Sequence, residues 1–527
     1  MYSVSDDFKT AVYAPARTSK ARITFDISDP TASGDVSSIT STAQATISDE
    51  SQLINKAREQ SYNLATCEPD RFKLDGSFIF ADDTLANNKE MGFASDILSG
   101  VDGSFSPFPT ITFQFGGNHS SVGITVTFDP LNGEYATEFN ISAYNSSDVL
   151  IDSVDVENND KPQYAAINPI NDYRKIVVTV KKWCKADRRA RVVEVDFGIV
   201  RMYTGDNLIK CSLIEELDLT TSSLPSVEFK FAVDNLDREF NILNPSGFYQ
   251  YLQQRQTILA ELGIKAGTIV EYVLLGSYLL FDWASDEGSL TASFTARTNL
   301  DTMSEVDYEN LVAKSSYSLN DMAVDMFALC GITNYQIDVG LQSILTNALV
   351  KKTDCKSILQ MIALAGCANI YITRDNIIVL KISPSSLGTE VVDTIDMDNM
   401  YQEAKIELEK ITKTVEVAYH ADLSNSAIIA VNNPGINSGE VLKLESNTLI
   451  NTSARATAVA DWLLLQKSYR AKYDVNWRGN PAHELNDIIT IENTYGDSKK
   501  AVITKNSIEY QGYLSAKTEA RGLTDVG

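Results

Sequence analysis

Basic residues gather in one short stretch of a chain that is otherwise acidic. Lysine and arginine total 45 residues against 70 aspartates and glutamates, which gives a formal net charge of −25. Between residues 174 and 191, however, eight basic residues stand against the single acid Asp187. Such a cluster could dock on an anionic surface, such as a wall polymer or an acidic neighbouring subunit. The candidate contact residues are Lys181, Lys182, Lys185, Arg188 and Arg189. The alternative is a strand–loop–strand whose solvent face is basic without any partner.

Residues that commonly perform catalysis or bind metals are few. The chain has only three histidines, His119, His420 and His483, and none of its six cysteines lies in a CxxC pair, so zinc-site spacing is absent. It also lacks the GxSxG, P-loop, HExxH and strand-linked GxGxxG motifs. We therefore expect a protein that is not an enzyme, with no catalytic residue, metal ligand or cofactor. The many carboxylates leave a carboxylate-pair glycosidase open as an alternative.

The cysteines are expected to be reduced and structural. Cys330 and Cys355 fall within expected helices, and Cys367 follows one. Cysteine at such positions packs as a small apolar residue. Proteins made in a cytoplasm keep their thiols reduced, so no disulfide is expected.

Charge and hydropathy restrict the partners. A net charge of −25 is unfavourable for gripping nucleic acid, whereas an acidic channel would repel DNA and let it slide. Simple solubility is the other explanation of this charge. No apolar run approaches the ~20 residues that cross a bilayer. Residues 1–7 have neither the basic nor the apolar part of a secretory signal, so a protein acting outside the cell would leave by another route, such as lysis.

The basic cluster belongs to a region rich in short strands. The length of 527 residues predicts three to four domains. Within residues 50–204, strand-like runs follow one another, and turns such as Asn132-Gly133 separate them, which predicts a β-sandwich. Residues 1–49 contain two weak strands, at 21–27 and 43–48, that have no core of their own. We expect their partners within residues 205–300, so the two flanks predict one barrel that the sandwich interrupts.

Helices and a hairpin mark residues 301–395 as an α+β domain. Ser318, followed three residues on by Asp321, predicts a helix start, and Gly331 predicts its end. The buried face of that helix is expected to carry Leu319, Met322, Ala323, Met326, Phe327 and Cys330. A second helix is predicted over residues 353–366, and a hairpin over 368–373 and 377–382.

Residues 396–527 predict a second barrel. An alternating strand at residues 412–419 precedes a helix over 452–470, whose apolar residues recur at helical spacing. Strand-like runs follow at 473–477, 487–492, 501–510 and 513–520, with Gln511-Gly512 as a tight turn. A strand, a crossing helix and an antiparallel meander together favour a small barrel that closes its own edges.

Several stretches carry a resemblance to known families. Residues 485–492 (LNDIITIE) and 508–517 (IEYQGYLSAK) resemble the closing barrel of bacteriophage tail-tip and baseplate hub proteins. The likeness is greatest to the hub-like minor tail proteins of phages that infect Gram-positive bacteria. Residues 275–281 (LGSYLLF), read as a hairpin turned at Gly276-Ser277, look like part of the first barrel of such hubs. Residues 112–128, 139–144 and 191–198 resemble galactose-binding-like jelly rolls.

The resemblance implies both a fold and a function. The expected fold is mainly β with an α+β module: two hub-type β-barrels, at 1–49 with 205–300 and at 396–527, an inserted β-sandwich or jelly roll at 50–204, and the α+β domain at 301–395. The implied function is a structural protein of the virion, made in the bacterial host cytoplasm, that joins the tail tube to the host-attachment apparatus and forms part of the DNA channel.

The resemblance also implies the partners. They are two further copies of the chain in a homotrimer, distal tail or tube proteins, receptor-binding or tail-fibre proteins, host cell-wall polysaccharide, and DNA that passes without specific binding, with no membrane span. The alternative is a carbohydrate-binding cell-surface protein, or a glycosidase with a jelly-roll binding module.

Overall fold

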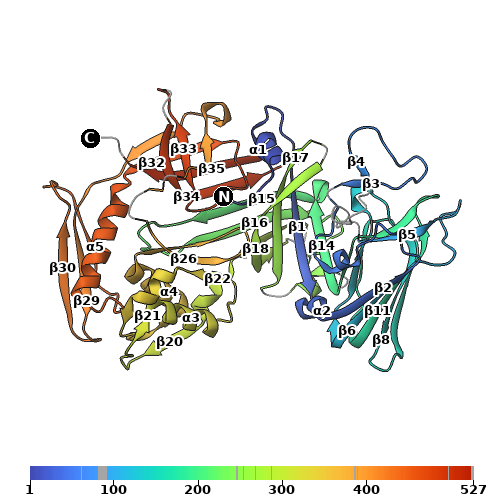
Figure 1. Ribbon diagram of the computed structural model, residues 1–527, viewed down its shortest axis with the longest axis horizontal. Coiled ribbons are helices and arrows are strands. Elements are labelled where there is room, and N and C mark those ends of the chain that lie inside the picture. The colour runs from blue at the N-terminus through green and yellow to red at the C-terminus, as the bar shows by residue number, and fades with distance from the viewer. Residues whose placement is uncertain are drawn as a thin grey trace. The chain divides into compact units, whose positions relative to one another are not determined.

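The chain divides into two compact units in a computed structural model (Figure 1). The structure describes residues 1–523 except 61, 81–91, 242, 245–246, 253–254, 268, 286–287, 385–386, 389 and 496–497. The first unit comprises Met1–Ile23, Thr204–Ile264 and Tyr272–Gly527, and the second comprises Thr24–Tyr203 and Lys265–Glu271. Strand β1 (Ser19–Ser28) carries the chain from the first unit into the second.

One long sheet forms the frame of the first unit. Its strands run in the order β17-β18-β19-β16-β15-β34-β35-β32-β28, and β33 pairs with both β34 and β27. The bounds are β15 (Leu208–Glu216), β16 (Ser226–Asp234), β17 (Thr257–Ala266), β18 (Ile269–Ala284), β19 (Thr291–Arg297), β27 (Asp393–Ile395), β28 (Lys405–Leu408), β32 (Ala471–Trp477), β33 (Ile488–Glu492), β34 (Ser498–Tyr510) and β35 (Leu514–Gly522). The strands expected in the two barrels therefore contribute neighbouring parts of one sheet.

Strands β15 and β34 join these two groups. They pair antiparallel from Cys211 opposite Tyr510 to Glu216 opposite Lys505. Both strands alternate buried and exposed residues over much of this length, as expected for strands with one face on a core. The pairing links segments that are almost 300 residues apart in the sequence, so no local sequence pattern announces it.

The hairpin expected at Gly276-Ser277 is wrong. Both residues lie inside the continuous strand β18. The Tyr278 ring lies so close to Gly276 that a Cβ built on this glycine would stand 2.7 Å from the Tyr278 hydroxyl oxygen. Glycine is present because an aromatic side chain covers the backbone there, and not because the chain turns.

The α+β segment has the elements that the sequence predicts. Helix α3 (Leu319–Leu329) begins at Ser318 with a capping box to Asp321, and helix α4 (Cys355–Gly366) follows its cap Asp354. The hairpin is β25 (Ala368–Ile372) with β26 (Ile378–Ile382), and β22 (Tyr335–Ile337) adds to β26 in parallel. Two smaller ladders pair β20 (Asp307–Asn310) with β24 (Val350–Asp354) and β21 (Tyr317–Ser318) with β23 (Leu345–Thr346). Local capping and periodicity decide these elements.

Two further helices belong to the first unit. The predicted helix at 452–470 is α5 (Ser453–Ser468), capped by Thr452, and it packs on the small sheet β30 (Ser426–Asn432), β29 (Thr412–His420) and β31 (Glu440–Leu444). Helix α1 (Asp6–Tyr13) was not predicted. It follows the cap Ser5 and buries Phe8 and Val12, which are too few apolar residues to give a periodic signal.

The second unit contains a β-sandwich. One sheet has the order β2-β6-β11-β8-β9 and the other β10-β7-β13. Both sheets contribute to a single core, in which Phe128 and Phe139 meet edge to face at 5.1 Å between ring centroids. The bounds are β2 (Val36–Thr42), β6 (Thr110–Ser121), β7 (Ile124–Thr127), β8 (Ala136–Tyr144), β9 (Leu150–Val156), β10 (Gln163–Ala166), β11 (Ile170–Trp183) and β13 (Glu194–Asp196).

Smaller elements complete the second unit. Strands β3 (Asn63–Ala65) and β4 (Phe78–Phe80) pair in parallel, and β5 (Phe93–Leu98) pairs with β12 (Arg189–Val192). Strand β14 (Gly198–Thr204) and the short helix α2 (Pro30–Gly34) are also present. The strand expected at residues 43–48 is wrong, because the second strand of the N-terminal region is β2 and it pairs with β6. The mainly β fold class with an α+β module is confirmed, whereas the domain limits at 49, 204, 300 and 395 stay predictions.

Candidate functional site

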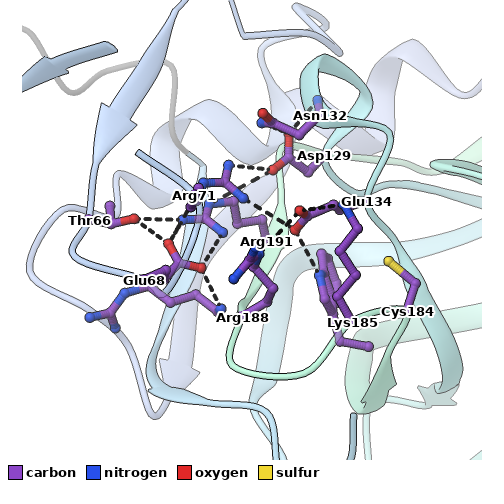
Figure 2. Close-up of polar contacts among 12 residues, drawn as sticks. Thr66, Glu68, Arg71, Asp129, Asn132, Glu134, Cys184, Lys185, Arg188 and Arg191 are labelled. Carbon is purple, nitrogen blue, oxygen red and sulfur yellow. Dashed lines mark hydrogen bonds and ion pairs between the residues drawn. The ribbon is translucent and has the colours of Figure 1, made fainter. Parts of the chain in front are cut away.

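Charged side chains from three segments meet in the second unit, in an arrangement that we call the ionic network (Figure 2). Thr66, Glu68 and Arg71 lie in the loop after β3, and Asp129 and Glu134 lie between β7 and β8. Trp183, Lys185, Arg188 and Arg191 come from the end of β11, the following loop and β12. The network therefore fastens a long loop to the sandwich.

The pair formed by Arg191 and Glu68 is its most deeply buried part. Both side chains are fully buried, and Arg191 donates to both carboxylate oxygens of Glu68, with Nη1 3.0 Å from Oε1. Arg191 Nη2 also donates to the Thr66 hydroxyl at 3.1 Å. Burial alone would raise the pKa of Glu68, but the hydrogen bond and charge of Arg191 hold that pKa at about 2. Glu68 is therefore ionised at neutral pH.

Arg71 connects this pair to the other carboxylates. Its Nη2 donates to Asp129 Oδ2 at 2.9 Å and its Nη1 to Glu134 Oε2 at 3.2 Å. Its Nε lies 3.8 Å from Glu68 Oε2. One planar guanidinium thus spans three carboxylates, which suits the fixed fork of arginine and not the single ammonium of lysine.

Glu134 accepts the remaining hydrogen bonds of the network. It accepts from Trp183 Nε1 at 3.2 Å, from Lys185 Nζ at 3.1 Å and from Arg188 Nε at 3.3 Å. Burial opposes its ionisation, but the Arg71 charge and these hydrogen bonds keep the pKa of Glu134 below its usual range. A carboxylate held ionised in this way cannot act as the general acid that a glycosidase requires. The geometry is therefore that of a structural brace.

The five predicted contact residues divide between this network and the sheet surface. Lys185 and Arg188 are members of the network, and the Arg189 backbone N–H donates to Glu68 Oε1 at 2.8 Å while Arg189 Nη1 donates to the Ser95 carbonyl at 2.6 Å. Lys181 pairs with Asp155 on β9, and Lys182 lies 3.6 Å from Glu138 on β8. Contact with an anionic surface stays a prediction for all five. The sequence signalled the arginines but not Glu68, Asp129 and Glu134, because acids are common everywhere in this chain.

A second ionic cluster in the same unit holds three acids against two cations. Arg58 donates to Asp196 at 2.9 and 2.7 Å and to Asp26 at 2.9 Å, and Lys56 lies 3.3 Å from Asp26. Glu194 accepts the backbone N–H groups of Lys56 at 3.0 Å and Arg58 at 3.4 Å. Burial and the neighbouring Asp196 charge raise the pKa of Glu194. The excess negative charge is relieved when Glu194 keeps its proton.

In the first unit, one buried arginine ties the α+β segment to the long sheet. Arg374, in the turn between β25 and β26, donates to Glu215 at 2.9 and 2.7 Å and to the His483 carbonyl at 2.6 Å. His483 in turn lies 2.8 Å from Asp393, which also accepts from Tyr13. His483 is fully buried, so this group is a structural connection and has no access to a substrate.

The described residues contain no group of three or more His, Cys, Asp or Glu side chains placed to hold a metal ion. Within the same part of the chain, no helix has both the length and the apolarity that a membrane span requires.

Comparison with known proteins gives matches among solved structures alone. No family model matches the chain, and no curated protein matches it. Similar solved structures include the 43 kDa tail protein of prophage MuSo2 from Shewanella oneidensis, with 10% identity, a TM-score of 0.42, and coverage of 61% of this chain and 95% of that one.

Two other tail proteins are similar to a comparable degree. The tail protein from Neisseria meningitidis MC58 has 10% identity and a TM-score of 0.43, covering 61% of this chain and 93% of that one. Prophage tail protein gp18 from Listeria monocytogenes EGD-e has 11% identity and a TM-score of 0.38, covering 60% and 91%. TM-scores below 0.5 at this identity do not establish a shared fold, and function has to be argued from the chain itself.

Proposed function

We propose that the protein is the hub of a phage tail tip, a structural virion protein that joins the tail tube to the host-attachment apparatus. The observation that carries the proposal is the pairing of β15 with β34, which makes the strands of residues 208–297 and 471–522 one continuous sheet. A hub transmits load between the tube and the attachment proteins, and a hydrogen-bonded sheet built from both chain regions provides a stiff path for it.

The sequence resemblance supports the same role. Residues 485–492 include β33, and residues 508–517 include the turn between β34 and β35. Both lie beside the strand that joins the two groups. These two stretches therefore help to build this part of the sheet, whereas the third stretch, residues 275–281, lies in β18.

The proposed assembly is a homotrimer around a DNA channel. Three copies, each with two barrel-like strand groups, would place six similar groups around one axis and so match the six-fold symmetry of a tail tube. The chain's formal charge of −25 would make the bore repel DNA and keep it mobile. Distal tail proteins and receptor-binding or fibre proteins are the other proposed partners.

The sandwich is proposed to serve host attachment, with wall polysaccharide as its ligand. Lys181 and Lys182 lie on β11 with side chains that are 35% and 36% exposed, and their acidic partners Asp155 and Glu138 are exposed too. Exposed pairs of this kind are weak, so an anionic polymer can compete for both lysines. The competing function is a carbohydrate-binding surface protein without a tail. The ionised state of Glu68 and Glu134 argues against a glycosidase at the ionic network.

The oligomeric state of the purified protein and its place in the particle test the hub proposal. We expect a mass of three chains, alone or when seated on the tail, and symmetry-free imaging of tails should show three copies at the tip. A stable dimer, or six copies at the tip, would contradict the proposal. Wall binding by a monomer that never joins a tail would favour the carbohydrate-binding alternative.

A further inference from the structure

A pocket lies in the first unit beside the hairpin of β25 and β26. Its volume is about 510 Å³, which is in the range of ligand-binding sites in proteins. The hairpin, the residues that follow it, the end of α5, and strands β33 and β34 all contribute to its walls. Aliphatic side chains such as Leu387, Val392 and Ile488 form much of the wall. The pocket is therefore able to hold an apolar group.

Two polar atoms of the wall have no hydrogen-bond partner in the part of the chain that the structure describes. They are Asn369 Oδ1 and Ser383 Oγ, and both are buried. Asn369 lies opposite Lys381 in the ladder of β25 and β26, so both side chains are on the same face of the hairpin, and both residues line the pocket. Only 4% of Asn369 is exposed. Because buried polar groups in native proteins are almost always hydrogen-bonded, we expect this amide to find its partner inside the pocket.

The interior of the pocket is neutral, and its charges lie at the mouth. Gln466, which is 5% exposed, adds a second side-chain amide to the wall. Lys381 and Glu390 are exposed and therefore mark the mouth. The carboxylate of Asp487 already accepts the Glu484 N–H at 2.8 Å. An unpaired charge is costly in such an interior, so a fitting occupant carries an uncharged polar group.

We propose that this pocket binds an aliphatic residue of a peptide together with the peptide group next to it. The side-chain amide of Asn369 has a donor and an acceptor, and a peptide group offers the same two functions, so the two groups can pair in both directions. A carboxylate only accepts and an ammonium only donates. The aliphatic walls take up the side chain of the bound residue. A sugar fits less well, because hydroxyls that face aliphatic walls would lose their hydrogen bonds to water without replacement.

The peptide belongs to a partner protein that presents such a residue on an exposed segment. In the proposed tail tip, that partner is a neighbouring tail protein. The binding site itself does not depend on the tail function, since it rests on the walls of the first unit alone.

Saturation-transfer NMR on the full chain tests the proposal with N-acetyl-leucine amide as the probe. The method detects weak ligands of large proteins, because magnetisation passes from the protein to the bound probe. We expect transfer to the probe that is strongest at its leucine methyl groups. N-acetylglucosamine carries the same acetamido group on a sugar, and we expect much weaker transfer to it. Titration with each compound gives the two dissociation constants.

Substitutions place the binding in this pocket. Asn369→Leu keeps the approximate size of the side chain but removes the amide, so it should weaken binding of N-acetyl-leucine amide about tenfold. It should melt no lower than the parent, because it removes an acceptor that has no partner among the described residues. Ser383→Ala should weaken binding less, and it tests the pocket from another wall if Asn369→Leu does not fold. The matched control is Asn437→Leu, at an exposed asparagine outside the pocket lining, which should bind like the parent.

Three results would overturn the proposal. The first is a parent protein to which N-acetyl-leucine amide does not bind, which would leave the pocket to water. The second is N-acetylglucosamine binding as tightly as N-acetyl-leucine amide. The third is parent-like binding of the peptide probe by every folded variant of Asn369 and Ser383. None of these results bears on the tail-hub proposal, which the oligomeric state and the place in the particle test.

Discussion

Replacing Arg191 by alanine should destabilise the second unit far more than removal of a surface cation. Arg191 is fully buried and supplies two hydrogen bonds to Glu68, whose side chain is also fully buried. Without it, Glu68 retains the Arg189 N–H at 2.8 Å, the Thr66 hydroxyl and the Arg71 Nε at 3.8 Å. Breaking a buried ion pair from one side costs about 3–5 kcal/mol when the remaining charge has no compensation, and the contacts that Glu68 retains place the expected loss at the lower end of that range.

A matched control is Lys182→Ala. Lys182 comes from β11 of the same unit and pairs with Glu138, but at 3.6 Å and with side chains that are 36% and 43% exposed. Exposed pairs of this kind contribute about 0–1 kcal/mol. The double variant Arg191→Met with Glu68→Leu should recover much of the loss, since it removes both charges and keeps apolar volume.

Hydrogen exchange of β11 peptides in the full chain, followed by mass spectrometry, measures the effect within the second unit alone. The pH dependence gives a second check. The folded pKa of Glu68, about 2, lies below its unfolded value of 4.5, so its stabilisation is complete above pH 4.5 and is lost as pH falls towards 2. The difference in stability between Arg191→Ala and the parent should therefore become smaller below pH 4.5. The reasoning would be refuted if Arg191→Ala lost no more stability than Lys182→Ala. It would also be refuted if the double variant were no more stable than Arg191→Ala.

Four further predictions concern other parts of the chain. Arg374→Ala should cost about 3–5 kcal/mol by leaving Glu215 buried and unpaired, measured as faster exchange in β15, and Arg374→Lys should recover only part because lysine cannot bind both oxygens. Because burial raises the folded pKa of Glu194, the parent should lose stability as pH rises from about 4.5 through that folded value. Glu194→Gln should lose less stability in thermal melts between pH 5 and 9, since burial also raises the pKa of Asp196 and Glu215 in both proteins. Replacing residues 50–204 by a short linker should leave a remainder that is folded by circular dichroism. An isolated fragment of residues 24–203 should melt at a higher temperature than one of residues 50–204, because only the longer fragment keeps β2 beside β6. Lys181→Ser with Lys182→Ser should weaken binding to isolated cell walls in low salt while leaving the melt unchanged, and equal binding by the double variant and the parent would leave the basic surface without this role.

The Lys181 and Lys182 pair is a cleaner test than substitution of all five predicted basic residues. Lys185 and Arg188 donate to Glu134, and the Arg189 side chain donates to the Ser95 carbonyl. Their removal would disturb the fold as well as the surface. The sequence located the basic cluster, but it could not separate residues that pair with the buried Glu134 from those that pair with exposed acids on the sheet.

The sequence by itself determined the elements whose signals are local. The Ser318–Asp321 capping box, the apolar spacing of α3 and the Thr452 cap of α5 each involve residues within a few turns of one helix. The hairpin β25–β26 and the short alternating strands of the sandwich are of the same kind. Such elements can be predicted because the interacting groups are neighbours in the chain.

Only the tertiary structure decided the pairings between distant segments. An alternating strand indicates which of its faces is buried but not which strand lies beside it. The sequence therefore predicts partners within residues 205–300 for the second N-terminal strand, whereas β2 pairs with β6, and it gives no sign of the junction of β15 with β34. The role of Gly276 could not be predicted for the same reason. A turn and a covering tyrosine ring both favour glycine, and only the three-dimensional structure places the ring over the backbone. The ionic network depends most of all on the tertiary structure. Glu68, Asp129 and Arg191 become a site only when loops more than 50 residues apart close on one another, because a buried charge is tolerated only where its partner arrives with it.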